Sequence, residues 1–159
     1  DFFKNNLIGG AELNDNVLIN YLNNNGFNVQ QINSHNLTEE DVVKNNLFII
    51  SNFVNIPETI RQMIMLKKYI IYEHDHKYLK KRDPSSYTDF LAPEKDIINK
   101  QFYQKAFKVV VLSQVCKEVI EKNLNIKNVH SIGCSLWSDE KLNFISSINK
   151  TKKTKLNLI

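Results

Sequence analysis

The stretch at residues 109–122 reads VVVLSQVCKEVIEK, and it predicts a buried strand that runs directly into an amphipathic helix. Four consecutive apolar residues at 109–112 are typical of a strand covered on both faces, as in a parallel sheet. Ser113 then supplies a helix cap, and Val115 and Val119 recur at helical spacing. Because parallel strands need crossover connections, this stretch favours an α/β fold.

The rest of the chain repeats this alternation of strand and helix patterns. Strands are expected at residues 27–32, 47–50, 69–72, 109–112 and 129–132, and helices at 14–25, from 38, from 57, at 97–106, from 113 and at 139–148. The stretch 74–94 is polar and contains Pro84 and Pro93, which predicts a long loop.

This order predicts a doubly wound, mostly parallel Rossmann-like sheet with helices on both faces. Residues 1–148 form one domain in this interpretation, and 149–159 are a basic tail or the start of a linker. Ligands of such sheets bind beyond the carboxyl ends of the strands. The candidate positions are therefore those that follow each expected strand: Ser51, Asn52, Glu73 to His76, Ser113, Gly133 and Cys134.

Composition limits the classes of function. The 159 residues fit one domain with its own core, and the net charge of +4 is mild, so we expect no nucleic acid partner. Cys116 and Cys134 lack metal-binding spacing and are typical of free thiols in a reducing compartment, which indicates a cytoplasmic protein. We expect no metal and no cofactor. Neither a serine nucleophile elbow nor a P-loop occurs, so hydrolase and NTPase classes lack support.

The segment Gly9-Gly10-Ala11-Glu12 opens an amphipathic run near the N-terminus. A glycine pair lets a ligand approach the backbone, and the free N–H groups of a helix start suit an anion. The alternative is a tight turn in which Glu12 is favoured by the helix dipole. A dehydrogenase fingerprint is the weaker hypothesis, because a third glycine is missing.

The densest ionisable cluster is Glu73-His74-Asp75-His76. Extended geometry predicts both histidines on one face and both carboxylates on the other. Zinc is an alternative ligand, but no convincing third ligand lies nearby in the sequence. A solvated loop is the remaining interpretation.

Lys77, Lys80, Lys81 and Arg82 follow this cluster, close to Tyr78. They could receive a phosphorylated acceptor or contact the anionic inner face of a membrane as a peripheral site. A run of charges can equally be a solvated face.

The order of the motifs resembles the N-terminal, acceptor-side domain of GT-B fold glycosyltransferases, in particular the retaining group often called family 4. The motifs are the Gly-Gly-Ala-Glu helix start, GFNV at 26–29, YEHDH at 72–76, VVVLSQVCKEVIEK, and VHSIGCSLWSDEKLNFI at 129–145. The resemblance covers nearly the whole chain. It implies that the family's first strand lies before Asp1 and that its second domain begins near Lys155.

By this resemblance, the full-length protein transfers a sugar from a nucleotide-sugar donor to a glycan, lipid or small-molecule acceptor. His74 is the expected catalytic contact, with Gly9, Gly10, Glu12, Glu73, Asp75, His76 and Ser113 as substrate-binding residues and Lys77, Lys80, Lys81 and Arg82 as an acceptor or anion surface. The second domain binds most of the donor, so this chain alone is expected to be inactive. The alternative is a Rossmann-like module that binds a nucleotide or a protein without catalysis.

Overall fold

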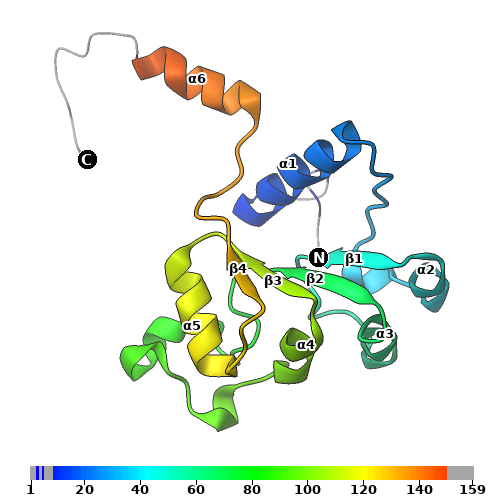
Figure 1. Cartoon of the computed structure of the whole chain (residues 1–159), viewed down its shortest axis with the longest axis vertical. Coiled ribbons are helices and arrows are strands. Elements are labelled where there is room, and N and C mark those ends of the chain that lie inside the picture. The colour runs from blue at the N-terminus through cyan, green and yellow to red at the C-terminus, as the bar shows by residue number, and fades with distance from the viewer. Residues whose placement is uncertain (1–2, 4, 6–8, 150–159) are drawn as a thin grey trace.

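The computed structural model describes residues 3, 5 and 9–149, and its centre is a parallel sheet of four strands (Figure 1). The strands are β1 (Leu47–Ile50), β2 (Lys68–Tyr72), β3 (Lys108–Val111) and β4 (Val129–Ser131). They lie in the sheet in chain order, and each pairs in parallel with the next. The expected α/β class with a parallel sheet is therefore confirmed.

Helices lie on both sides of this sheet. They are α1 (Gly10–Asn24), α2 (Glu39–Lys44), α3 (Glu58–Ile64), α4 (Lys100–Lys105), α5 (Gln114–Leu124) and α6 (Asp139–Asn149). Figure 1 shows α3, α4 and α5 below the sheet and α1 above it. Right-handed crossovers between strands that advance in one direction place their helices on one face, which explains the common side of α3, α4 and α5. The described strands contain no reversal of this direction.

The core lies between the sheet and the crossover helices. Ile50, Ile71, Val109 and Val129 are in register across all four strands, and each is less than a tenth exposed. Aromatic rings fill the layer beneath them: Phe102 of α4 packs against Phe53 and Tyr69 with ring centroids 4.7 and 4.8 Å apart. Burial of this row and these rings supplies the main stabilisation of the fold.

Side-chain hydrogen bonds cap the N-termini of α5 and α2 at the residues where the sequence predicted that these helices start. The Ser113 hydroxyl accepts from the backbone N–H of Cys116 at 3.1 Å and caps α5. Thr38 and Asp41 form a capping box at α2, in which each side chain accepts from the other's backbone N–H.

Two expectations about strands are wrong. Residues 27–32 form no strand, although their polar and apolar residues alternate. None of the described strands pairs with them, and the side chain of Phe27 is 59% exposed. A sheet with helices on both faces would also bury both faces of β1, but Leu47 and Ile49 are 49% and 41% exposed. Alternation predicts an extended backbone, but a strand also needs a partner for its hydrogen bonds.

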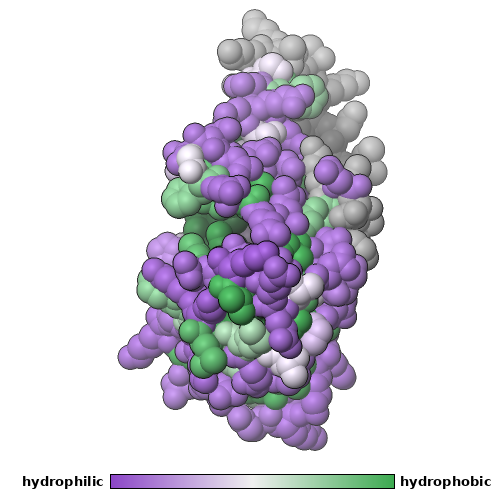
Figure 2. Space-filling view, turned by 90° about the vertical axis from the view of Figure 1, so that its right-hand side faces the viewer, coloured by the Kyte–Doolittle hydropathy of each residue, from purple (hydrophilic) through white to green (hydrophobic). Residues whose placement is uncertain are grey.

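The face of the sheet beneath α1 is only partly covered. A groove of about 690 Å³ runs between this helix and the sheet, lined by apolar side chains that include Val17, Leu18, Ile49 and Val110. Figure 2 shows hydrophobic side chains around a hollow on the side of the molecule that faces right in Figure 1. Among residues 9–149, no helix is both long and apolar enough to cross a membrane.

The loop predicted at 74–94 contains no strand and no α-helix, and short 3-10 turns occur at Pro84–Ser86 and Thr88–Phe90. It is nevertheless closely packed. The side chains of Tyr78 and Leu79 are fully buried. α6 matches the helix predicted at 139–148, whereas the basic tail at 150–159 lies outside the described residues.

Asn123 of α5 hydrogen-bonds to residues 90–92 at the end of this loop, and this contact can be tested by mutation. Its amide nitrogen donates to the carbonyls of Phe90 and Val119 at 2.7 and 2.8 Å, and its oxygen accepts from the N–H of Ala92 at 2.8 Å. We expect Asn123→Ala to lower the free energy of unfolding by about 3 kcal/mol in urea titrations, because these buried groups lose their partners.

The matched control is Gln114→Ala on the exposed side of the same helix, which removes one hydrogen bond to Glu118. It should change the free energy of unfolding by less than about 0.5 kcal/mol. Equal effects of the two variants would contradict the proposed role of Asn123.

Candidate functional site

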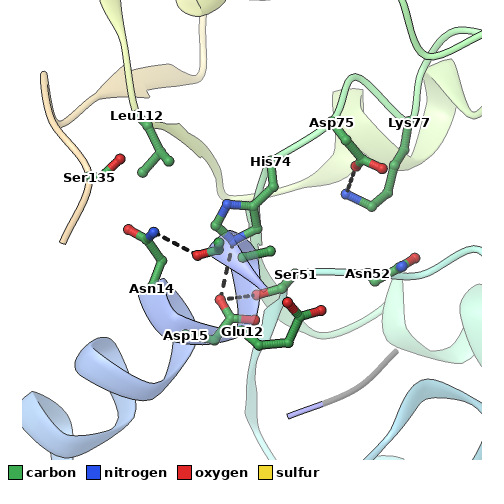
Figure 3. A pocket seen from close by; sticks show the side chains of 12 residues that line it. Glu12, Asn14, Asp15, Ser51, Asn52, His74, Asp75, Lys77, Leu112 and Ser135 are labelled. Atoms are coloured by element: carbon green, nitrogen blue, oxygen red, sulfur yellow. Dashed lines mark hydrogen bonds and ion pairs between the residues drawn. The ribbon is translucent and has the colours of Figure 1, made fainter. Parts of the chain in front are cut away.

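A polar cavity of about 430 Å³ lies where β1, β2 and β3 end beside the first turns of α1 (Figure 3). It is lined by Gly10, Ala11, Glu12, Asn14, Asp15, Ser51, Asn52, His74, Asp75, Lys77, Leu112 and Ser135. The carboxyl ends of parallel strands are where ligands bind in open α/β sheets. Ser51, Asn52 and His74, which are among the positions expected after strands, line this cavity together.

The first turn of α1 forms one wall of the cavity. Gly9 caps the helix in an extended conformation, and a side chain there would collide with the carboxylate of Glu12. Gly10 lines the cavity, with open space where a Cβ would lie. The Glu12 carboxylate thus lies at the helix N-terminus, the position that a bound anion would take.

Asp15 is the centre of the hydrogen bonds within the cavity. Its Oδ1 accepts from the Ser51 hydroxyl at 2.8 Å and lies 3.2 Å from Nε2 of His74. Figure 3 shows the three side chains converging from α1, the end of β1 and the end of β2. The Asp15 and His74 side chains are each 11% exposed. The ring of Tyr72 packs edge-on against His74, with centroids 4.5 Å apart.

This arrangement differs from a catalytic triad. In a triad, histidine lies between the nucleophile and the acid, so that it can remove the nucleophile's proton. Here Asp15 lies between Ser51 and His74, and both contact the same carboxylate oxygen. Ser51 is therefore a positioning group for Asp15, and His74 is the residue available to a ligand.

Asn14 connects α1 to the segment after β4. Its side-chain nitrogen donates to the carbonyl of Gly10 at 2.9 Å, and its oxygen accepts from the N–H of Leu136 at 2.6 Å. Both hydrogen bonds lie at the cavity wall, so they hold the first turns of α1 against the sheet.

Behind the cavity, a buried network organises the chain after β2. Lys77 Nζ lies 3.0 Å from Glu73 Oε1 and also pairs with Asp75, while the Tyr103 hydroxyl donates to Glu73. Glu73 and Lys77 are each 3% exposed. The pKa of Tyr103 is held well above its usual value by burial and by the Glu73 carboxylate, so its hydroxyl remains a donor.

The expected two-sided arrangement of residues 73–76 is wrong, because β2 ends at Tyr72 and the chain turns immediately afterwards. His74 faces the cavity, whereas His76 adopts a left-handed φ of 54° and contacts the Tyr78 hydroxyl at 3.2 Å and Cys116 Sγ at 3.9 Å. Glu73 points into the buried network. His74 therefore contacts the cavity, whereas His76 contacts Tyr78 and α5.

The basic run does not form one continuous surface. Lys77 is buried in ion pairs, which corrects its expected place on an anion-binding surface. Arg82 bonds to Asp75 at 2.9 Å, and Lys80 lies 4.0 Å from Asp96. Burial raises the pKa of Asp75, but Lys77 and Arg82 outweigh this effect and hold the pKa below its usual value. Lys81 is exposed.

Several predicted substrate-binding residues lie outside the cavity lining, namely Gly9, Glu73, His76 and Ser113. Gly9 and Ser113 cap helices, while Glu73 and His76 stabilise the turn after β2. Asn14 and Asp15 line the cavity but were not among the predicted site residues. The available signal was their position less than two helical turns after the glycine pair, where polar side chains lie near the helix N-terminus.

Comparison with known proteins identified no relatives: no family model, no curated protein and no solved structure matches the chain. Among the described residues, no group of three or more His, Cys, Asp or Glu side chains is arranged to hold a metal ion.

The buried ion pairs generate one prediction. Lys77→Met should lower the free energy of unfolding by about 4 kcal/mol in urea titrations, because Glu73 and Asp75 would lose their buried counter-charge. Lys81→Met is the matched control, since it makes the same substitution at an exposed lysine, and it should have an effect below about 0.5 kcal/mol. A small effect of Lys77→Met would show that the network contributes little to folding.

His76 generates a second prediction, about pH. Burial lowers its pKa, although Glu73 and Asp75 act in the opposite direction. As the pH falls below 6.5, the usual pKa of histidine, His76 therefore takes up a proton in the unfolded chain before it does so in the folded chain. The free energy of unfolding should fall between pH 7.5 and pH 5.5, and His76→Asn should reduce this fall.

Asparagine is chosen because it tolerates the left-handed backbone at this position. The control is His130→Gln at an exposed histidine, which should retain the dependence on pH. If His76→Asn showed the same fall as the unmodified chain, His76 would not be its source.

Proposed function

We propose that this chain is the acceptor-side domain of a GT-B fold glycosyltransferase, similar to the retaining family 4 group. The observation that carries the proposal is His74, which follows β2 and faces a polar cavity closed by the Gly-Gly-Ala-Glu helix start. These two motifs are more than sixty residues apart, yet they lie on the same cavity. Their order in the sequence is the order on which the resemblance rests.

The position of α1 also supports this fold assignment. In a doubly wound sheet, helices change faces where the direction of strand order reverses. α1 covers the face opposite to the crossover helices α3, α4 and α5 (Figure 1). We propose that the cavity lies beside such a switch point.

In this proposal, the cavity receives the sugar or acceptor end of the substrates. The lining provides amide, hydroxyl, carboxylate and imidazole groups, which suit the many hydroxyl groups of a sugar. His74 would contact the reacting sugar, and catalysis would depend mainly on positioning and on stabilisation of the leaving phosphate. A second domain would bind most of the nucleotide.

The test is a donor screen on the full-length gene product that contains this chain. Nucleotide release from UDP-, GDP- and ADP-sugars would be measured with glycan, lipid and small-molecule acceptors. We expect turnover with one donor class, and we expect His74→Ala to reduce kcat about 100-fold, since it removes one positioned hydrogen-bonding group. Residues 1–159 alone should show little or no transfer.

His130→Gln serves as the control, because His130 is an exposed histidine on strand β4. Full activity of His74→Ala would overturn the role of His74. Binding of a nucleotide or a protein by the full-length product without any turnover would support the second candidate, a binding module without catalysis.

A further inference from the structure

The cavity is rich in carboxylates and poor in available positive charge. Glu12, Asp15 and Asp75 contribute carboxylates, and Lys77 is the only Lys or Arg among the lining residues. The Lys77 ammonium is already held by Glu73 at 3.0 Å and by Asp75. A phosphate entering this cavity would meet Glu12 at the helix N-terminus and would find no free ammonium group in the lining.

The hydrogen bond to Asp15 determines which nitrogen of His74 carries the proton. An ionised carboxylate can only accept, so Nε2, which lies 3.2 Å from Asp15 Oδ1, must be the protonated nitrogen. None of the described residues hydrogen-bonds the other nitrogen, Nδ1, and Figure 3 shows it turned away from Asp15. In neutral His74, Nδ1 is therefore an acceptor.

The Ser51 hydroxyl reinforces this arrangement. It donates to the same Asp15 oxygen at 2.8 Å, so the carboxylate receives two donors in a largely buried position. Ser51 and His74 come from neighbouring strands, and the sheet therefore fixes their separation.

We propose that Asp15 is a positioning residue that holds His74 in the Nε2–H form. We propose also that the carboxylates of the lining exclude phosphate, so that the cavity selects uncharged ligands with hydroxyl groups, such as sugars, which can donate to Nδ1 of His74. The proposal rests on the cavity of the proposed function, but it concerns protonation and binding rather than transfer. It replaces the anion-binding interpretation of the Gly-Gly-Ala-Glu start, because Glu12 takes the place of the anion.

Nitrogen-15 NMR of the histidine side chains in the 159-residue chain tests the first half of the proposal. At pH 7.5, His74 should show a protonated Nε2 and an unprotonated Nδ1. Asp15→Asn should shift His74 toward a mixture of the two neutral forms, because an amide can both donate and accept. Ser51→Ala is the matched control, since it removes the other donor to Asp15 and should leave the Nε2–H form in place.

The backbone amide spectrum shows whether each variant is folded, so a loss of structure is not mistaken for a change of tautomer. An Nδ1–H form in the unmodified chain would overturn the proposal. An unchanged tautomer in folded Asp15→Asn would overturn it as well.

Ligand titrations test the second half. N-acetylglucosamine and inorganic phosphate would be added separately at equal concentrations, and the amide shifts of Gly10, Ser51 and His74 would be followed. We expect a larger response to the sugar. Glu12→Gln should raise the affinity for phosphate about tenfold, because it removes a like charge near the helix start.

A response to phosphate equal to or larger than the response to the sugar, including no response to either, would overturn the selectivity. Failure of sugar transfer in the full-length product would overturn the proposed function alone, because the tautomer and the exclusion of phosphate are measured without a donor.

Discussion

The buried ion pair between Glu73 and Lys77 is the constraint on which the site depends. A carboxylate and an ammonium that are both removed from water must stay paired, since either one alone would be strongly destabilising. The residues lie four apart, so the chain must turn directly after β2 to bring them together. This turn directs His74 toward α1 and His76 toward Cys116 on α5.

The parallel sheet determines what surrounds that turn. All four strands run in the same direction, so the residues that follow β1, β2 and β3 lie together at the carboxyl end of the sheet. The first turns of α1, which lies on the face of the sheet opposite to α3, α4 and α5, complete the cavity there. The cavity is consequently assembled from segments that are far apart in the sequence. Hydrogen bonds between elements hold part of the lining: Asn14 bonds to the segment after β4, and Asp15 bonds to Ser51 after β1.

Local signals predicted much of this fold. The apolar run at 109–112, the Ser113 cap and the helix start at Thr38 all mark real elements, because their causes lie within a few residues. Residues 27–32 were predicted wrongly, since pairing depends on a neighbouring strand that alternation does not identify.

The candidate site was harder to predict, because its contacts also depend on segments that are distant in the sequence. Lys77 looks like part of a basic run, and only the folded chain brings Glu73 and Asp75 around it. Asp15 stands between Asn14 and Asn16, as a residue on a solvated helix face would, and its partners Ser51 and His74 come from distant strands. His74 could be predicted as a candidate because it comes shortly after the apolar stretch that forms β2.

The open side of β1 has a consequence for the behaviour of the chain in concentrated solution. β1 pairs only with β2 among the described strands, and none of the described residues forms a ladder with its outer side. Leu47 and Ile49 add exposed apolar surface on this strand. An apolar strand edge of this kind is a template for pairing with another polypeptide, so β1 favours self-association more than the inner strands β2 and β3, which have partners on both sides.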